Sequence, residues 1–451
     1  MTNQTEINAA KCRLFGDGMM NRKDRYSEIQ INHIPIMITD SGKILCIPQN
    51  KETQHIGITG QTGKGKGILN NSLLGMEHYM NKTHCLILND FQSETHENSL
   101  PSMNNIFNEN LKVINVKPQG LPIVYVYPSN RSLKINDTEL RFPHIKMSLP
   151  TESIIRNIEH YYKLDKSAKY VTAYIDKFLE CKDLEQIREV LDEILPDKGE
   201  NKNKVAAEMK FKILASFKNI FDERLCNSVA PEAPAFLNVL NNGIKYSNMT
   251  IQALMFCDFI PSIQTSEIRN KRWFSAYMSY IVENIYRDKY EDESFLKNNK
   301  ISMYVPELDK MWKNDNGELI KTALGLTGTN GRRAGIGLRW DAQDYDSIPD
   351  SIRSNTKYLF VLRKANADEV RGIAKDFGVD KNIVEAILHL NTDASKGLFE
   401  CVALTTDKFI LYSENGSTTY TSAPQKGRLI TPMAQHCKPG YPLSCLLEDL
   451  K

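Results

Sequence analysis

The chain has 451 residues, of which 41% are hydrophobic and 25% are charged, and its formal net charge is +2. This composition is that of an ordinary globular protein and not of a disordered chain, and the length suits one large domain with an insertion or two domains. The small net charge gives no overall sign of a nucleic-acid partner, although a local basic face would not show in that sum.

The cysteines and the apolar stretches bear on the compartment. Nine cysteines are scattered without a Cys-x-x-Cys pair, so we expect small buried thiols in a reducing compartment and neither a zinc site nor a disulfide framework. Residues 1–15 lack the apolar core of a signal peptide, and the longest apolar stretch, 251–263, is shorter than a membrane span and contains Asp258. We therefore expect a cytoplasmic protein without a membrane span.

In chain order, the first predicted element is a β-hairpin at 34–48, because two alternating apolar runs flank Asp40-Ser41-Gly42. From His55 onward, short apolar runs alternate with longer helical patterns, which is typical of a mostly parallel sheet covered by helices. We expect strands of this sheet at 55–59, 85–88, 112–116, 251–256, 301–305, 335–340 and 358–362.

Helices are expected between these strands. Apolar residues recur at helical spacing in 69–80 and again in 274–285, so each stretch presents one buried stripe. Residues 153–221 also have a helical pattern, with a solvated break at 196–204, and they predict an inserted helical subdomain. After residue 397 the pattern changes to short strands around an Asn415-Gly416 turn, which predicts a β-meander.

A glycine-rich loop lies between the 55–59 strand and the helix that follows. Its residues satisfy G-x-x-x-x-G-K, the pattern of a phosphate-binding loop (P-loop), and they are Gly60, Gln61, Thr62, Gly63, Lys64, Gly65 and Lys66. Glycines let the backbone wrap a phosphate, the helix N-terminus supplies N–H groups, and Lys66 reaches the β- and γ-phosphates of ATP. The alternatives are a chance glycine-rich turn and, for Lys64, an ordinary solvated lysine, which we prefer for that residue.

Two positions of the chain depart from the pattern that is usual in P-loop ATPases. Gly67 stands where Ser or Thr normally binds Mg²⁺, although it still belongs to the predicted nucleotide-binding segment. Glu307 ends the 301–305 strand, where P-loop ATPases hold a carboxylate that polarises the attacking water, but Pro306 replaces the metal-associated acid before it. The alternative is that Glu307 merely begins a helix as a favourable acid. The sequence therefore assigns no metal ligand.

A polar residue marks the end of another strand. Gln343 follows the 335–340 run, at a place where a side chain beside the phosphates can sense the γ-phosphate. A glutamine there is by itself more often a surface residue. What favours a role for Gln343 is its position in the chain, after the glycine-rich loop and Glu307.

Four blocks in this order resemble the HerA/FtsK superfamily, which includes HerA-type helicase-translocases, type IV secretion and conjugation ATPases, and viral DNA-packaging ATPases. The blocks are HIGITGQTGKGKG, LILNDFQSE with Asp90 and Glu94, YVPEL with Glu307, and GRRAGIGLRWDAQ with Gln343. Residues 374–404 are also similar to the segment of conjugation ATPases in which a short helical pair precedes a strand. Asp90 and Glu94 have the alternative of being ordinary strand-end acids in water.

The resemblance implies a RecA-like α/β fold, ATP and Mg²⁺ as cofactors, and a homo-hexameric ring that moves DNA through its pore. Arg332 and Arg333 match the family's arginine position, at which an arginine of one subunit completes the neighbouring subunit's site. The alternatives are that the two arginines belong to a pore loop or are an ordinary solvated pair. The DNA is expected to be double-stranded and held through phosphates without sequence preference. Nuclease, secretion or capsid proteins are the partners that the family implies.

On this basis the chain divides into five segments. They are a short N-terminal β module (1–54), the P-loop half of the ATPase domain (55–150), a helical insertion (151–250), the second half (251–425) and a C-terminal tail (426–451). The predicted function is an ATP-hydrolysing DNA translocase, with packaging or conjugative transfer as uses of the same motor. The alternative from another class is a degenerate P-loop protein that binds nucleotide with little hydrolysis and serves as a structural or regulatory ring component. A small-molecule kinase is disfavoured because nothing resembles a lid.

Overall fold

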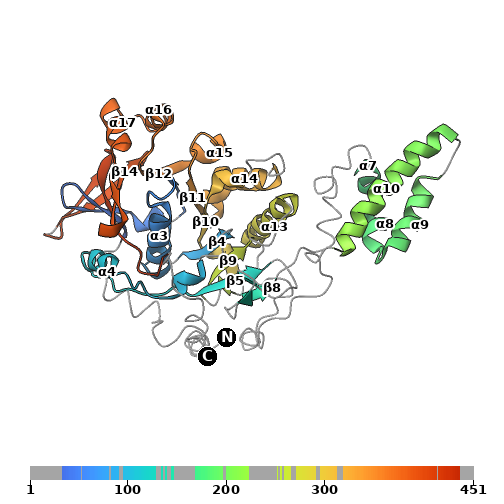
Figure 1. Ribbon diagram of the computed structural model, residues 1–451, viewed down its shortest axis with the longest axis horizontal. Coiled ribbons are helices and arrows are strands. Elements are labelled where there is room, and N and C mark those ends of the chain that lie inside the picture. Colours follow the sequence, from blue (N-terminus) through green and yellow to red (C-terminus); the bar gives the residue numbers. More distant parts are fainter. Residues whose placement is uncertain are drawn as a thin grey trace.

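The computed structural model describes residues 33–51, 53–80, 83–90, 95–127, 134–135, 138–139, 144–146, 168–196, 200–222, 251, 254–255, 258–265, 271–290, 295–311, 318–413 and 415–436. Within these residues the chain forms one large mixed sheet with helices on both faces, and a group of helices lies at one end of the molecule (Figure 1). Glu94 and residues 153–167, about which the sequence makes predictions, lie outside the described residues.

The strands of the large sheet are β1 (Ile34–Thr39), β2 (Ile44–Ile47), β3 (His55–Thr59), β4 (His84–Asp90), β5 (Ile123–Tyr127), β8 (His144–Lys146), β9 (Ile260–Gln264), β10 (Ile301–Val305), β11 (Ile336–Ala342), β12 (Thr356–Val361), β13 (Thr392–Asp393), β14 (Leu398–Thr405), β15 (Phe409–Tyr412), β16 (Thr418–Thr421) and β17 (Gln425–Leu429). A separate pair is formed by β6 (Lys134–Ile135) and β7 (Thr138–Glu139).

The α-helices are α3 (Lys66–Met80), α4 (Asn105–Lys112), α7 (Ala168–Ala173), α8 (Ile175–Glu180), α9 (Leu184–Ile194), α10 (Glu200–Asp222), α13 (Lys271–Tyr290), α14 (Glu318–Ala334), α15 (Asp350–Arg353), α16 (Ala367–Asp376) and α17 (Lys381–Leu388). Short 3₁₀ turns are η1 (Gln49–Lys51), η2 (Thr95–Ser99), η4 (Phe295–Asn298), η5 (Leu308–Lys310) and η6 (Ala394–Lys396). Of the helices described here, none has the length and apolar character needed to cross a lipid bilayer.

The parallel part of the sheet runs in the order β12-β3-β11-β10-β4-β9-β5-β8. One strand, β11, therefore separates β3, which leads into the glycine-rich loop, from β10, which leads to Glu307. This is the strand order of a RecA-like fold and confirms the predicted mostly parallel α/β architecture. Because the carboxyl ends of parallel strands meet at one edge, the loops after β3, β10 and β11 converge there.

The antiparallel part continues from β14, which pairs with β12, in the order β14-β17-β1-β2-β15-β16. The predicted hairpin is confirmed as β1 and β2, with Gly42 at φ 78° in the turn. The C-terminal strands are antiparallel as predicted, but they do not form a continuous meander, because β1 and β2 lie between β15 and β17. Segments 1–54 and 426–451 thus both contribute to the main sheet, and the five-segment division remains a proposal.

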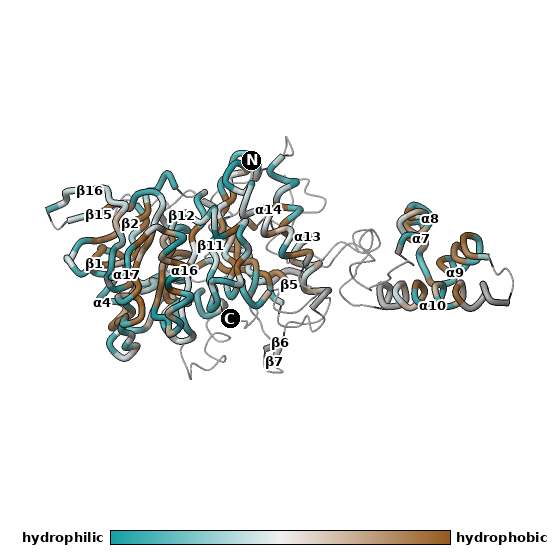
Figure 2. Tube along the Cα trace, turned by 90° about the horizontal axis from the view of Figure 1, so that it is seen from above, coloured by the Kyte–Doolittle hydropathy of each residue, from teal (hydrophilic) through white to brown (hydrophobic). Residues whose placement is uncertain are grey.

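The sheet buries side chains on both faces. In β4, Leu86 and Leu88 join one apolar core, whereas Cys85 and Ile87 join the other, as alternation along a doubly covered strand requires. The first core includes residues of α13 and α14, and the second includes residues of α3 and α4. Figure 2 shows the hydrophobic residues concentrated along the strands. Of the described cysteines, Cys181 is partly exposed and the others are buried, and all are free thiols.

Two predicted strands are wrong. Lys112 is the last residue of α4 and 113–116 follow it, so the strand lies later, at β5. Asn104 caps α4, and Phe107 and Leu111 form its buried stripe. Of the predicted strand 251–256, the described residues Ile251, Leu254 and Met255 are helical and buried, and the strand is β9. In 251–256 the described apolar residues lie three and four positions apart, which is helical spacing, whereas 113–115 form the turn that ends α4.

The predicted helical subdomain is represented by α7 to α10, which Figure 1 places at one end of the molecule. The rings of Phe178 and Phe217 stack with 5.2 Å between centroids and hold α8 against α10. Tyr174, four residues before the buried Phe178, is 41% exposed. The predicted break at 196–204 is shorter than expected, because α10 begins at Glu200 and its Glu and Lys residues favour a helix.

A buried histidine makes the stability of this fold depend on pH. His55, the first residue of β3, accepts a hydrogen bond at Nδ1 from the Leu338 amide (2.9 Å), and its Nε2 donates to the Gly328 carbonyl (3.0 Å). This pairing requires a neutral ring. Burial, helped by the Arg339 charge, lowers the pKa of His55 from 6.5 to about 4. The unfolded chain therefore takes up a proton before the folded chain does.

We expect the stability contributed by His55 to be complete above pH ~6.5 and to be lost as the pH falls toward ~4, with a loss of about 2 kcal/mol between pH 7 and 5. Urea unfolding of the wild type and of His55→Gln over this range measures the difference. The same substitution at His389, whose side chain is 80% exposed, is the control. Equal pH dependence in the wild type and in His55→Gln would contradict the prediction.

Candidate functional site

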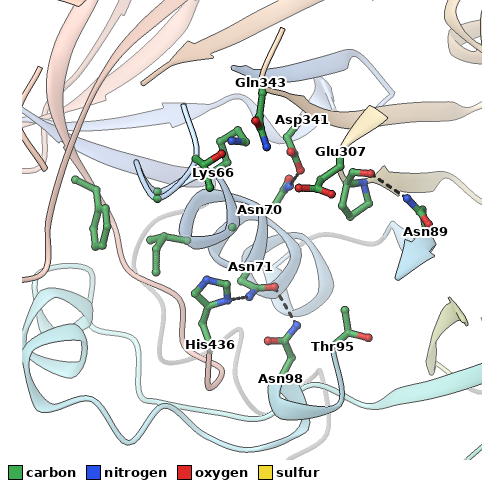
Figure 3. A pocket seen from close by; sticks show the side chains of 17 residues that line it. Lys66, Asn70, Asn71, Asn89, Thr95, Asn98, Glu307, Asp341, Gln343 and His436 are labelled. Atoms are coloured by element: carbon green, nitrogen blue, oxygen red, sulfur yellow. Dashed lines mark hydrogen bonds between the residues drawn. The ribbon is translucent and has the colours of Figure 1, made fainter. Parts of the chain in front are cut away.

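A cavity of about 440 Å³ lies at the carboxyl edge of the parallel strands, where α3 begins (Figure 3). Its walls are formed by Thr62, Gly63, Gly65, Lys66, Gly67, Ile68, Asn70, Asn71, Asn89, Thr95, Asn98, Pro306, Glu307, Asp341, Gln343, Phe399 and His436. The cavity thus brings together the glycine-rich loop, Glu307 and Gln343, which are far apart in the sequence. Gly60, Gln61 and Lys64 of the predicted segment do not line it.

The loop adopts a conformation that its glycines permit. Gly63 and Gly65 have φ values of 72° and 106°, in the region that side-chain-bearing residues rarely adopt. Gly60 is needed for space, because a Cβ there would lie 2.6 Å from Leu362 Cβ. The backbone can therefore fold closely over a phosphate, with the N-terminus of α3 directed toward the same space.

Lys66 is the first residue of α3. Its Nζ donates hydrogen bonds to the carbonyls of Gly60 (2.9 Å) and Gln61 (3.3 Å), which hold the ammonium over the loop. Burial lowers the pKa of Lys66, and the negative charges of Asp341 and Glu307 act in the opposite direction. A cation held over a glycine loop is suited to binding an anion such as phosphate.

Gly67 has a steric explanation. A Cβ at this position would lie 2.8 Å from Cε1 and 3.0 Å from Nε2 of His436, so the imidazole fills the space that a Ser or Thr side chain needs. His436 comes from the C-terminal segment, and its Nδ1 is hydrogen-bonded to Asn71. Burial lowers the pKa of His436 to about 4, so the ring is neutral near pH 7. Sequence analysis missed His436, because nothing in its local pattern indicates contact with the loop.

Glu307 follows Pro306 directly after β10 and has left-handed backbone angles, φ 51° and ψ 44°. Such a conformation is costly for a residue with a side chain, and it is found most often at functional sites. Glu307 is also the N-cap residue of η5, without a side-chain capping hydrogen bond. Its carboxylate accepts a hydrogen bond from Lys310 Nζ (2.6 Å), and Asn89 Nδ2 donates to the Pro306 carbonyl (3.3 Å).

Gln343 follows β11 directly, at the wall of the cavity. Its main-chain carbonyl accepts a hydrogen bond from Lys364 Nζ (2.6 Å), and Lys364 also forms an ion pair with Glu369. Lys364 and Glu369 are both largely buried, so they position the backbone of Gln343 while its side chain borders the cavity. This placement is the one that a γ-phosphate sensor requires.

Arg332 and Arg333 do not join these residues within one chain. They are exposed in the last turn of α14, just before β11 begins. The charge of Arg332 acts on His55, the first residue of β3, so the pair lies near the amino ends of the strands. The cavity lies at the opposite ends. Any contact of these arginines with a nucleotide therefore needs another subunit.

The second of the four sequence blocks, LILNDFQSE, lies only partly within the described residues. Asp90 ends β4, but its side chain and residues 91–94 are outside the described residues, so their predicted acids stay untested. Its neighbour Asn89 does line the cavity, and its Oδ1 accepts a hydrogen bond from the Thr265 hydroxyl (2.8 Å).

Asp341 is the acidic residue of the cavity that sequence analysis missed. It lies in β11, two residues before Gln343, and is 4% exposed. Asn70 Nδ2 and the Glu307 backbone amide donate hydrogen bonds to its carboxylate. Burial raises the pKa of Asp341 from 3.8 to about 6, although Lys66 acts against this rise. The signal that could have found it is an acid within the largely apolar run 336–342, in which Arg339 is the other charged residue.

The cavity suits a magnesium nucleotide. Among the described residues, no three His, Cys, Asp or Glu side chains cluster in a way that could hold a metal ion. Mg²⁺ at nucleotide sites is usually held by phosphates, waters and one or two carboxylates, and does not need such a cluster. Asp341 and Glu307 are carboxylates that fit this requirement.

No family model matches the sequence, and no curated protein matches it. Among solved structures, the chain is similar to VirB4 of Thermoanaerobacter pseudethanolicus, with 12% identity, coverage of 91% of this chain and 97% of that chain, and a TM-score of 0.48. It is also similar to the plasmid coupling protein TrwB in complex with GDPNP, with 10% identity, coverage of 93% and 95%, and a TM-score of 0.47.

A third similarity is to the genome packaging NTPase B204 from Sulfolobus turreted icosahedral virus 2, with 13% identity, coverage of 36% of this chain and 66% of that chain, and a TM-score of 0.22. The strand order, the loop conformation and the place of the cavity give this chain the fold of a RecA-like P-loop NTPase.

Proposed function

We propose that the chain is an ATP-hydrolysing ring motor that translocates DNA. The observation that supports it best is the convergence of Lys66, Glu307 and Gln343 on one cavity, at the edge of the sheet where the glycine loop lies. A loop that binds phosphate, a carboxylate for water and a polar side chain for the γ-phosphate are the parts that nucleotide hydrolysis needs.

In this proposal each residue has a separate task. The loop amides and Lys66 hold the β- and γ-phosphates, Glu307 orients and polarises the attacking water, and Gln343 contacts the γ-phosphate. Mg²⁺, when bound with ATP, neutralises charge on the phosphates. The left-handed backbone of Glu307 directs its carboxylate along the cavity wall, on the side of Asp341 (Figure 3).

The ring and the DNA rest on the sequence resemblance. Arg332 and Arg333 are exposed and far from their own cavity, so they are available to complete the site of a neighbour in a homo-hexamer. Double-stranded DNA in the pore is expected to be held through its phosphates. Packaging and conjugative transfer are particular uses of such a motor, and a nuclease, a secretion protein or a capsid protein is the corresponding partner.

A second candidate is a ring component that binds nucleotide and hydrolyses it little. Two observations favour it. His436 occupies the space that the usual Ser or Thr side chain would need at position 67, and Pro306 replaces a metal-associated acid. The two candidates predict the same nucleotide affinity but different turnover.

Lys66→Ala is expected to weaken ATP binding about 10- to 100-fold, because it removes a charged hydrogen-bond donor to the phosphates. Calorimetric titration measures the affinity, and phosphate release with and without double-stranded DNA measures turnover. Lys64→Ala, which changes a loop lysine outside the cavity wall, is the matched control. The motor proposal expects DNA to raise the turnover; binding without hydrolysis under any condition favours the second candidate, and no binding at all would overturn both.

A further inference from the structure

Two positions that usually carry metal-associated groups in P-loop ATPases carry other residues in this chain. Position 306, at the end of β10, is a proline, and Gly67 has no hydroxyl. The cavity nevertheless contains a second carboxylate besides Glu307, on the strand next to β10.

The register of the sheet shows how this carboxylate is placed. Val305 of β10 lies opposite Trp340 of β11, so the next residues, Pro306 and Asp341, are at the same level. On its other side, Asp341 lies opposite Ile58 of β3, two residues before the loop begins. Neighbouring strands are about 4.8 Å apart, so Asp341 is displaced sideways from position 306 by one strand, toward the loop.

The surroundings direct the Asp341 side chain toward the loop. Asn70, one turn into α3 from Gly67, donates a hydrogen bond to its Oδ2, and the Glu307 amide donates another. The positive charge of Lys66 acts on Asp341 and partly compensates its negative charge. Figure 3 shows the carboxylate beside Asn70, between Gln343 and Glu307.

Among the described residues, no ion pair offsets the free-energy cost of burying this carboxylate. Lys66 Nζ is hydrogen-bonded to loop carbonyls and not to Asp341. Buried charges in proteins are usually paired or coordinate metals, and a divalent cation in the cavity would supply the missing charge.

We propose that Asp341 is the metal-associated carboxylate of this site and replaces the acid that is lost at position 306. The inference rests on the proposed nucleotide-binding function and makes it more specific. Asn70 then acts as a positioning residue that orients the carboxylate, while Glu307 keeps the role of polarising the attacking water. On this proposal the metal-associated acid has moved from position 306 to Asp341, and only the hydroxyl at Gly67 is lost.

The test compares nucleotide affinity with and without metal. A non-hydrolysable ATP analogue is titrated calorimetrically into the full chain, once with Mg²⁺ and once with EDTA. For Asp341→Asn we expect the metal-dependent gain in affinity to fall about 10-fold or more, as for loss of a charged ligand. Affinity in EDTA should be unchanged or higher, because a negative charge near the phosphates is removed. A merely structural role of Asp341 would weaken both.

Asp309→Asn is the matched control. Asp309 is as buried as Asp341 and its charge also acts on Lys66, but it does not line the cavity. It should keep the wild-type gain from Mg²⁺. An Asp341→Asn chain that also keeps the full gain would overturn the inference and leave the proposed function standing. A wild type that binds no nucleotide would overturn the proposed function, and the inference with it.

A measurement on the wild type covers the case in which Asp341→Asn does not fold. Fe²⁺ substituted for Mg²⁺, with ascorbate and peroxide, cleaves the backbone next to the bound metal, and mass spectrometry locates the cuts. We expect nucleotide-dependent cleavage beside residue 341. Cuts confined to the loop and to 306–307 would overturn the inference.

Discussion

Glu307→Gln is expected to reduce the rate of ATP hydrolysis by about 10²- to 10⁴-fold, the usual contribution of a positioned general base, while nucleotide binding is retained. Glutamine keeps the size of the side chain and can still accept the hydrogen bond from Lys310 (2.6 Å in the wild type). What it loses is the charge that polarises water. Single-turnover hydrolysis and calorimetric titration on the same preparation separate the two effects.

Glu109→Gln is a matched control for this prediction. Glu109 also forms an ion pair with a lysine three residues later, Lys112, at 2.6 Å, but it is exposed on α4 and does not line the cavity. Its turnover should equal that of the wild type. If Glu307→Gln hydrolyses ATP at the wild-type rate, Glu307 is not the base.

Glu77→Ala is expected to lower the free energy of unfolding by about 3–5 kcal/mol, because it leaves a buried guanidinium without its counter-ion. The side chains of Glu77 and Arg339 are both 0% exposed. Arg339 Nε donates to Glu77 Oε1 (2.9 Å), and Tyr304 donates its hydroxyl hydrogen to Oε2 (2.7 Å). The cluster therefore joins α3 to β11 and β10, the elements that carry Lys66, Asp341 and Glu307.

Urea unfolding measures this loss. Glu109→Ala breaks an exposed ion pair instead and should change stability by less than about 1 kcal/mol. Replacing both partners, as in Glu77→Leu with Arg339→Met, should be less harmful than Glu77→Ala alone, because no unpaired charge stays buried. An effect of Glu77→Ala as small as that of the surface control would show that the buried pair does not hold the helix to the sheet.

Local patterns were sufficient for much of the fold. The strand, loop and helix around residues 55–80 are each indicated by neighbouring residues: an apolar run, glycines and a helical stripe. The error at 251–256 arose because a short apolar stretch satisfies helical and strand spacing about equally. Only packing chose between them, since Leu254 and Met255 are buried as part of a helix.

The residues of the candidate site also divide into those that the sequence predicted and those that only the structure revealed. The sequence by itself determined the phosphate loop, Glu307 and Gln343, because each follows a strand and their chemistry is legible from residue type and order. The tertiary structure alone decided that Asp341 stands level with position 306, that His436 fills the space above Gly67, and that Arg332 and Arg333 lie away from their own cavity. The physical reason is that these relations depend on sheet register and on contacts between residues distant in the chain, which no local pattern of side chains encodes.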